Sequence, residues 1–583
     1  MSQRKIKKQR AVEKTVVETV ESSEKIKHSI KSILKNNWLF LVIVSVGILL
    51  LFLNAMKGDF VSDDYATIIN NSDIHSWSYF SHNLTPVVLA NFLIGNIFGV
   101  IPFSYHLFSI LFYILTCWVA LVFLNFVTNE NVSRISIMIF ALMPIHVESV
   151  SWISGKPYLF IALFVMLSFI FYVKYLEEKK IGYIWISSII FILATASDPI
   201  RPYCLFAVIG LYLLLVNRNE FWKMTVKLIP IMMLLIVVGV FMKWQMISVR
   251  VGIVNSGYNA SDSIFYNPFF QYPTGIPKYL QLMFFPFDLT LYHTMYVFPV
   301  LLNWSILLIF LGLCGYAFIK NKGIFFALVF FLVTLLPSMA PVKVSWLVAE
   351  RYGYLPSLGI AMFMGIIIND IWKKNKFLAW GIIGCFSVTF SVRTFMRNID
   401  WQTNHKLWVN TCQVSPNSHN AWNNIGDDYD KLATIAKTGE EKSRQYENAI
   451  KGFTQSTIVK PNYADAFHNR ANIFFKIGRL DLARESYNTA LHFSPGLYQT
   501  YLSLTQIDMM EGKDQLALQH AMQATQIEPN NPQAIYVLAV VYAQTGNLQK
   551  AAEILTEMVR VYPKFNIAAE TLKQVKAAMI GNS

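Results

Sequence analysis

The sequence predicts an all-helical membrane protein in which a bundle of spanning helices is followed by a helical solenoid. Hydrophobic residues make up 54% of the 583 residues, aromatic residues make up 15%, and the mean hydropathy is +0.41. A chain this apolar is typical of a protein with many membrane-spanning helices. The apolar excess ends near residue 400, beyond which the sequence is polar and carries proline at a fixed interval. We therefore expect a membrane domain over 38–397 and a repeat domain over 398–583.

Residues 1–37 form a basic tail ahead of the first apolar run. The tail has no short apolar core followed by a small-residue cleavage site, so we expect it to stay uncleaved and cytoplasmic. Its ten basic residues are Arg4, Lys5, Lys7, Lys8, Arg10, Lys14, Lys25, Lys27, Lys31 and Lys35. The formal net charge of the whole chain is +14, but the basic residues flank apolar segments instead of forming a face with interleaved aromatics. This pattern argues against nucleic acid as a partner.

Eleven apolar runs in the membrane domain are long enough to span a bilayer. They are 38–54, 105–127, 132–148, 157–176, 182–197, 202–217, 226–246, 300–319, 323–340, 354–372 and 377–395. Two further runs, 84–101 and 276–292, are interrupted by Pro, Gly, Asn or Asp. We expect these two to lie in the membrane interface, where an amphipathic helix is more stable than a spanning one.

The basic loops between the runs set the orientation of the bundle. With the tail inside and both interrupted runs interfacial, one set of loops faces the cytoplasm, as the positive-inside rule requires. Those loops carry Lys174, Lys179, Lys180, Arg218, Lys223, Lys320, Lys322, Lys373, Lys374 and Lys376. The C-terminal domain is then external.

This orientation places five polar clusters, far apart in the sequence, on the external face. They are Asp63 with Asp64, His146 with Glu148, Lys156, Asp198 with Arg201, and Glu350 with Arg351 and Tyr352. Ionisable residues at the mouth of a membrane bundle are costly, so their convergence predicts one active site at the outer leaflet. The alternative is that they are solvated loop ends or helix caps.

The five cysteines, Cys117, Cys204, Cys314, Cys385 and Cys412, lie mostly inside apolar runs, without CxxC pairing or metal-ligand spacing. We expect them to be buried small hydrophobes.

Proline recurs every 34 residues at Pro461, Pro495, Pro529 and Pro563. This is the period of tetratricopeptide repeats. We expect four repeats over about 419–563, with an insertion of about 11 residues around 434–443 in the first, and a capping helix at about 565–579. Such arrays bind extended peptides on a concave face, although a purely structural or dimerising role remains the alternative.

Several motifs of the membrane domain resemble one family. The matching stretches are 63–65 (DDY), 103–106 (FSYH), 144–155 (PIHVESVSWISG), 277–279 (PKY), 285–286 (FP), 348–359 (VAERYGYLPSLG) and 397–401 (RNIDW). With the repeats, their order resembles that of the transmembrane and tetratricopeptide-repeat containing protein O-mannosyltransferases and their bacterial relatives, within the GT-C glycosyltransferases. The resemblance implies a GT-C bundle whose two interfacial runs are jaw helices.

The resemblance also implies a reaction. The donor is a polyprenyl-phosphate sugar, with mannose expected, and the acceptor is a Ser or Thr hydroxyl of an exported protein. Asp63 is the expected general base and Asp64 orients the acceptor or exchanges roles with it. Arg351 is the first candidate to stabilise the leaving phosphate, followed by Lys156, His146 and Lys278. The remaining expected substrate-site residues are Glu148 and Glu350, which orient these cations, Tyr352, which lines the sugar pocket, and Asp198 with Arg201.

Three points stay open at this stage. A divalent cation held by the two aspartates is an alternative, but the local basic groups favour no metal and no other cofactor. The chain could instead be a non-enzymatic scaffold that acts through its repeats, or a GT-C enzyme that transfers an oligosaccharide or uses a lipid or glycan acceptor. The compact external loops favour a bacterial inner membrane with a periplasmic site over the endoplasmic reticulum.

Overall fold

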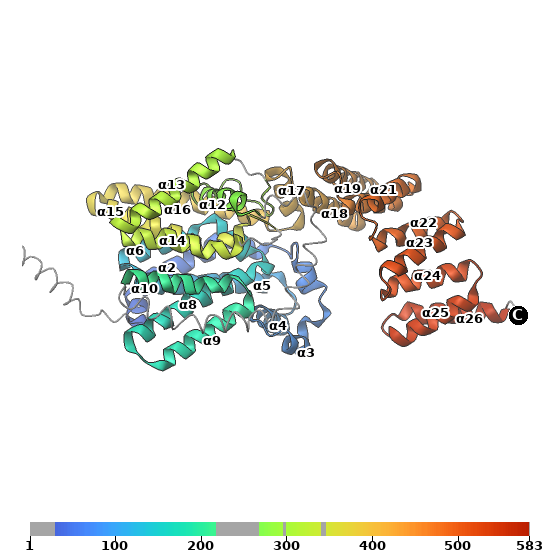
Figure 1. The fold of residues 1–583 in the computed structure, drawn as a ribbon, viewed down its shortest axis with the longest axis horizontal. Coiled ribbons are helices and arrows are strands. Elements are labelled where there is room, and N and C mark those ends of the chain that lie inside the picture. The colour runs from blue at the N-terminus through green and yellow to red at the C-terminus, as the bar shows by residue number, and fades with distance from the viewer. Residues whose placement is uncertain (1–28, 217–266, 295–298, 340–345, 582–583) are drawn as a thin grey trace, which may run out of the picture. The chain divides into compact units, whose positions relative to one another are not determined.

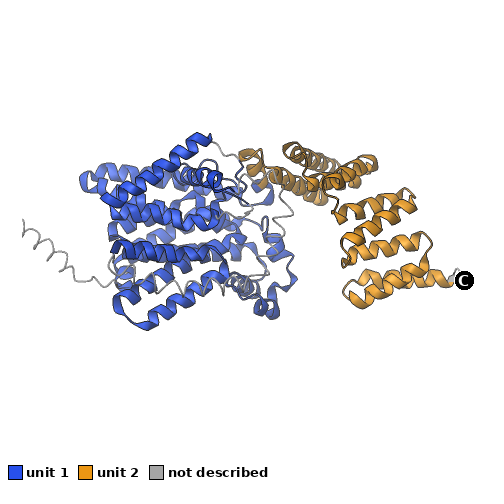
Figure 2. Cartoon of the chain, viewed as in Figure 1, with its two compact units in different colours: residues 1–407 blue, residues 408–583 orange. Residues whose placement is uncertain are grey.

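The computed structural model describes residues 29–216, 267–294, 299–339 and 346–581, and these residues form helices and connecting segments without a β-strand. The chain separates into two compact units, residues 1–407 and residues 408–583 (Figures 1 and 2). The expected domain boundary at 397/398 falls inside α16 (Lys376–Asp400), which belongs to the first unit.

The first unit contains the apolar helices. Six described helices are long and apolar enough to cross a membrane: α2 (Ile30–Leu51), α5 (Pro102–Val127), α8 (Lys156–Glu178, extended to Ile153 by a 3-10 turn), α13 (Val300–Lys320), α14 (Lys322–Leu335, continued to Met339) and α16. A seventh candidate is a helix pair bent by 57°, made of α6 (Glu130–Leu142) and the segment Pro144–Ser151 that includes α7 (Val147–Ser151). The protein is therefore a multi-span membrane protein.

The remaining expected spans differ in detail. The runs at 182–197 and 202–217 form the shorter apolar helices α9 (Ile181–Ser197) and α10 (Cys204–Val216). The run at 354–372 forms α15 (Ser357–Lys374), which ends in Asp370, Lys373 and Lys374 and so is less apolar than the six. The expected span 226–246 and the basic tail up to residue 28 lie outside the described residues. Of the eleven expected spans, six are therefore described helices that are long and apolar enough to cross a membrane.

The two interrupted runs form short helices. The first gives α4 (Pro86–Phe98), with Thr85 as its N-cap, and the second belongs to α12 (Pro268–Phe284), which contains Pro273 and Pro277. A helix of 13 or 17 residues is shorter than the roughly 20 residues that span a bilayer upright.

Glycines allow close packing where α15 crosses its neighbours. A Cβ added at Gly359 would lie 2.6 Å from the carbonyl oxygen of Ala327 in α14, and one at Gly365 would lie 2.2 Å from the Ser136 hydroxyl oxygen in α6. Small residues at such crossings let helix backbones approach in a membrane protein. Cys117, Cys204, Cys314 and Cys412 are buried as expected, but Cys385 is exposed on α16. The prediction for Cys385 was wrong because an apolar run does not reveal which helix face points outward.

The second unit is an array of helix pairs. The pairs are α18 (His419–Ile435) with α19 (Gly439–Val459), α20 (Ala464–Lys476) with α21 (Leu480–Phe493), α22 (Tyr498–Met510) with α23 (Asp514–Ile527), and α24 (Pro532–Gln544) with α25 (Leu548–Val561). Helix α17 (Asn404–Val414) precedes them and α26 (Asn566–Gly581) closes the array. Gly478, Gly512 and Gly546 have positive φ at the turn inside successive pairs, a conformation that glycine adopts without steric cost. The expected insertion lengthens α19 to 21 residues.

Candidate functional site

The acidic pair lies on the segment that connects α2 to the short helix α3 (Trp77–His82). Before the pair, Ser62 has a positive φ of 54°, and after it Tyr65–Ile69 form a single π-helical turn. The Ser62 N–H donates to the Asn404 side chain at 2.8 Å, which helps hold this conformation. Left-handed non-glycine residues and π-turns cost energy and concentrate at functional sites. The local backbone therefore fixes two adjacent carboxylates in different surroundings.

The Asp64 carboxylate is buried and acts as an acceptor. One oxygen accepts from the Val61 N–H at 3.0 Å, and the other accepts from the Ser154 N–H at 2.8 Å and the Ser154 hydroxyl at 2.5 Å. Burial raises the pKa of Asp64 to about 6, although the hydrogen bonds and the charge of Lys156 oppose this rise. The Asp63 side chain is exposed and has no hydrogen bond to the described residues. Of the two carboxylates, only that of Asp63 is thus exposed.

Lys156 lies close to the acidic pair at the start of α8. Its side chain is buried, with its ammonium 4.6 Å from the centre of the Tyr105 ring and without a hydrogen-bond partner among the described residues. A buried ammonium without a partner is costly unless a ligand anion or a water satisfies it. The preceding Gly155 packs so tightly that an added Cβ would lie 2.6 Å from the Glu148 carbonyl oxygen. The segment from Glu148 to Lys156 therefore joins the acidic pair to a second charged cluster.

That second cluster is built on Glu148 and Arg351. The fully buried Glu148 carboxylate accepts from the Arg351 guanidinium and, at 2.8 Å, from the Arg351 backbone N–H. Burial opposes the charge on Arg351, but the Glu148 carboxylate outweighs it and raises the pKa of Arg351 well above its ordinary value. The guanidinium also lies 5.5 Å from the Trp152 ring. Arg351 is consequently a fixed, permanent cation.

Arg201 and Arg351 both contact the ring of Tyr352. Their guanidinium carbons lie 4.5 and 5.0 Å from the centre of this ring. Arg201 forms an ion pair with Asp198 and donates to the Ser338 hydroxyl at 2.9 Å. Arg201, Arg351, Tyr352 and Tyr158 help to line a small cavity of about 20 Å³, which has room for about one water molecule. Asp198 thus holds Arg201 much as Glu148 holds Arg351.

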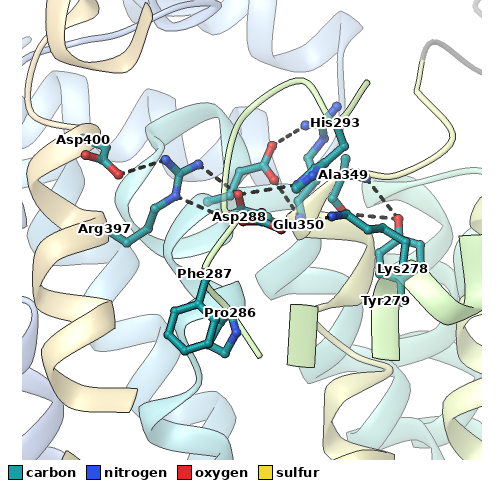
Figure 3. Close-up of polar contacts among 12 residues, drawn as sticks. Lys278, Tyr279, Pro286, Phe287, Asp288, His293, Ala349, Glu350, Arg397 and Asp400 are labelled. Carbon is teal, nitrogen blue, oxygen red and sulfur yellow. Dashed lines mark hydrogen bonds and ion pairs between the residues drawn. The ribbon is translucent and has the colours of Figure 1, made fainter. Parts of the chain in front are cut away.

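A third cluster surrounds Glu350 (Figure 3). Its carboxylate accepts from the Arg397 guanidinium at 2.9 and 3.3 Å and lies 3.7 Å from Nε2 of His293. Burial raises the pKa of Glu350, but the charge of Arg397 and the contact with His293 outweigh this and leave it below the ordinary value. Glu350 therefore pairs with Arg397 of α16, whereas the neighbouring Arg351 pairs with Glu148 of α7. Glu350 does not orient Arg351 directly, because its partners are Arg397 and His293.

Lys278 lies in the same region as this third cluster. Its ammonium is 3.7 Å from the Asp288 carboxylate. Figure 3 shows Lys278 next to Tyr279, whose hydroxyl donates to the Ala349 carbonyl at 3.2 Å. Burial lowers the pKa of Lys278, and Asp288 opposes the shift.

His146 lies in a different environment from the other expected site residues. It is fully buried, with Nδ1 2.8 Å from the Tyr113 hydroxyl and Nε2 2.7 Å from the Ser357 hydroxyl. The rings of Phe140 and Tyr354 pack against it at 4.4 and 4.8 Å. Both ring nitrogens are already occupied, so in this arrangement His146 bridges helices and does not reach a phosphate.

Sequence reasoning did not select Arg397, His293 or Ser154 as site residues. Arg397 and Ser154 occur within the motif stretches 397–401 and 144–155, which was an available signal. His293 stands alone in its segment, and its contact with Glu350 could only be found in the folded chain. Within the described residues, no group of three or more His, Cys, Asp or Glu side chains is arranged to hold a metal ion.

The arrangement defines a membrane protein with acidic and basic groups gathered along the segment 146–156, followed by tetratricopeptide repeats. Family models described as "Tetratricopeptide repeat" match residues 440–498 and 509–575. The human protein named "Protein O-mannosyl-transferase TMTC3" is 24% identical over 578 residues, which cover 88% of this chain and 60% of that protein. The mouse protein named "Protein O-mannosyl-transferase TMTC4" is 24% identical over 494 residues, which cover 70% of this chain and 66% of that protein.

These matches confirm the resemblance that the motifs indicated: over most of its length the chain is similar to the transmembrane and tetratricopeptide-repeat containing protein O-mannosyltransferases. It spans about 60% of the length of the human relative. Among solved structures, one titled "Crystal structure of YrrB: a TPR protein with an unusual peptide-binding site" covers 35% of this chain and 97% of its own chain at 17% identity, with a TM-score of 0.24.

Proposed function

We propose that this protein is an O-mannosyltransferase that moves mannose from a polyprenyl phosphate to a Ser or Thr hydroxyl of an exported protein. The names of its relatives support the activity. The observation that carries the proposal for the site is the contrast within the acidic pair. Asp63 is exposed with a free carboxylate, whereas Asp64 is buried and held by Ser154 and Val61. One carboxylate is available for chemistry while the other fixes the loop.

In the proposed reaction, the acceptor hydroxyl oxygen attacks C1 of the sugar as the bond from C1 to the phosphate oxygen breaks. The hydroxyl proton passes to the Asp63 carboxylate, and the electron pair of the broken bond remains on the lipid phosphate. A single displacement inverts the anomeric centre. General-base assistance of this kind contributes about 100-fold to 10,000-fold to the rate.

The leaving phosphate needs positive charge near the acidic pair. Lys156 is proposed for this role because its ammonium is buried near Asp64 without a hydrogen-bond partner among the described residues. Arg351 and Arg201 are proposed to contribute charge across Tyr352, with Glu148 and Asp198 fixing their orientation. These side chains supply neutralisation without a metal ion, so the proposed reaction uses no cofactor.

The repeat domain is proposed to bind acceptor proteins, since such arrays commonly hold extended peptides. The acidic pair and the repeats are proposed to lie on the external side of a bacterial inner membrane. Lys278 and Glu350, which belong to the cluster that Figure 3 shows, are proposed to border the same substrate site.

The test compares Asp63→Asn with the unchanged full-length protein in detergent or liposomes. Transfer of labelled mannose from a polyprenyl phosphate to a Ser/Thr peptide is measured, and donor binding is measured in parallel. Asp63→Asn keeps the side-chain size but cannot take the proton, so we expect donor binding to persist while transfer falls about 100-fold or more. Asp59→Asn, four residues earlier on the same segment, is the control.

Normal transfer by Asp63→Asn and by the double variant Asp63→Asn/Asp64→Asn would refute the base assignment. No transfer by the unchanged protein with any lipid-linked monosaccharide, together with retained binding of partner proteins to the repeats, would favour the scaffold function. Transfer only from a lipid-linked oligosaccharide, or only to a lipid or glycan acceptor, would instead favour the other GT-C activities.

A further inference from the structure

A groove lies in the first unit, on a part of the bundle that contributes none of the site residues. It is bordered by α2, α6, α15 and α16, and its volume is about 320 Å³. This volume is at the lower end of the range for small-molecule sites, about 300–1,000 Å³. Phe40, Met138, Trp372 and Trp380 form apolar walls, and Asn369 and Arg134 supply polar groups.

The helix arrangement explains why a groove opens here. Near their C-terminal ends, α2 and α16 are joined, because the Asn398 side chain donates to the Leu51 carbonyl at 3.1 Å and the Asn54 side chain donates to the Phe395 carbonyl at 2.8 Å. The groove lies toward the N-terminal ends of the same two helices, at Phe40 and Trp380, where residues of α6 and α15 complete its lining. Helices α2 and α16 are therefore joined near their C-terminal ends and flank the apolar groove nearer their N-terminal ends.

Two polar groups in the groove are left without full partners. Asn369 is 5% exposed and lines the groove, yet its side-chain amide makes no hydrogen bond to the described residues. An amide that lines a groove without a protein partner is available to form a hydrogen bond with a ligand. The Arg134 guanidinium donates through Nε to Asn37 at 2.6 Å and through Nη2 to Glu130 at 2.6 Å, so Nη1 is the nitrogen that remains for a ligand.

The charge around the groove is positive. Lys373, Lys374 and Lys376 are exposed at the adjoining ends of α15 and α16, and only Lys373 pairs with a carboxylate, that of Asp370 at 2.9 Å. Beside them, Phe377 and Trp380 are 90% and 59% exposed. Exposed aromatics next to lysines at the end of a spanning helix are typical of the level where lipid headgroups lie. The positive charge beside apolar walls is therefore suited to a molecule that has both an anionic group and an apolar chain.

We propose that this groove binds an anionic phospholipid of the bilayer. The phosphate and glycerol oxygens accept from the Asn369 amide and the free Arg134 nitrogen, with Lys374 and Lys376 adding attraction. The acyl chain lies between Phe40 and Trp380 and covers Trp372 and Met138. Basic pockets between spanning helices are known to select anionic headgroups in this way. The bound lipid would fill the groove between α2 and α16 and so brace the bundle.

Native mass spectrometry of the full-length protein in detergent tests the proposal. Phosphatidylglycerol and phosphatidylcholine with identical acyl chains are titrated separately, and the dissociation constant of the first bound lipid is measured. We expect phosphatidylglycerol to bind at least 10-fold more tightly, since each lysine near an anionic headgroup contributes about 1 kcal/mol. Equal affinity for the two lipids would overturn the proposal.

Two variants and a matched control locate the lipid. Asn369→Leu removes the buried amide at nearly constant volume, and Lys374→Gln/Lys376→Gln removes exposed rim charge without threatening folding. Each should weaken phosphatidylglycerol binding about 10-fold. The control Lys320→Gln/Lys322→Gln, which removes the lysines at the adjoining ends of α13 and α14, should leave it unchanged. An equal loss in the control would indicate nonspecific charge attraction and refute the site. Tighter binding of a polyprenyl phosphate with the same sensitivity to the variants would assign the groove to a carrier lipid and refute the phospholipid.

Discussion

At the residue scale, the main feature is that neighbouring charged side chains have different environments. Asp63 is exposed and Asp64 is buried, and Glu350 pairs with Arg397 while Arg351 pairs with Glu148. Backbone geometry separates each pair, because consecutive residues in tight turns point in different directions. A carboxylate or a guanidinium can therefore be available to substrate one residue away from a structural one.

Arg351 is predicted to matter more for turnover than its charge alone implies. Arg351→Lys keeps the charge but loses the planar fork that Glu148 orients, and Arg351→Ala loses both, so the rate of transfer should fall in that order. Loss of a charged contact in the transition state costs about 100-fold or more. Transfer is measured at matched protein levels, with Arg444→Ala in the exposed part of α19 as the control.

A second variant distinguishes the effect of Arg351 on folding from its effect on turnover. Arg351→Ala leaves Glu148 buried and unpaired, which costs about 3–5 kcal/mol, whereas Glu148→Gln/Arg351→Gln removes both charges. If the double variant is as stable as the unchanged protein and also transfers mannose normally, Arg351 is a structural residue only.

The raised pKa of Asp64 predicts a pH dependence of stability. Its value is about 6 in the folded protein, against an ordinary value of 3.8. Because the folded state binds this proton more tightly, the stabilisation is fully present below about pH 4 and is lost as the pH rises through about 6. The loss approaches 3 kcal/mol, since one pKa unit equals about 1.4 kcal/mol.

The measurement is the midpoint of thermal unfolding in detergent between pH 4 and pH 7. The difference between unchanged protein and Asp64→Asn should shift in favour of the variant as the pH rises. A difference that is constant across this range would show that burial does not raise the pKa of Asp64.

At the element scale, helix packing depends on glycine where α15 crosses α14 and α6. Gly359→Ala would place a Cβ 2.6 Å from the Ala327 carbonyl oxygen and 2.7 Å from the Phe331 nitrogen, both backbone atoms that cannot rotate away. We expect the free energy of unfolding to fall by about 1–3 kcal/mol.

Gly384→Ala on α16 is the matched control for this packing. A Cβ at Gly384 meets nothing within 4 Å, so the substitution should leave stability unchanged or raise it by up to about 1 kcal/mol, because alanine favours a helix. Thermal unfolding of the two variants is compared. Equal stability of both would mean that α14 and α15 do not pack closely at Gly359.

At the scale of the whole molecule, the basic loops predict the orientation in the membrane. A cysteine introduced at Gly439, at the start of α19, should react with a membrane-impermeant maleimide in intact cells whose outer membrane is permeabilised. The reason is that we expect the tail and the lysine-rich loops to be cytoplasmic. A cysteine introduced at Gly323, beside Lys320 and Lys322, should be protected. The reverse labelling pattern would overturn the orientation and with it the external active site.

The sequence by itself determined the membrane domain, the repeats and the segments that carry the site. Composition and a period of 34 residues can be read from the sequence without knowledge of the tertiary contacts. They were therefore sufficient to predict the helix pairs and most of the apolar helices. The motif stretches contain Asp64, Glu148 and Arg351, and Lys156 directly follows the stretch 144–155, so the sequence also indicated these residues as candidates.

Only the tertiary structure decided which partner each charged side chain has. Arg397 reaches Glu350, Ser154 reaches Asp64, and His146 bridges Tyr113 and Ser357 in the core. These contacts join residues up to 211 positions apart in the chain. They depend on which face of each helix turns inward, and helices that are apolar all round do not encode that face in their hydrophobic pattern. The groove arises in the same way, because residues of α2, α6, α15 and α16 that are far apart in the sequence line it together.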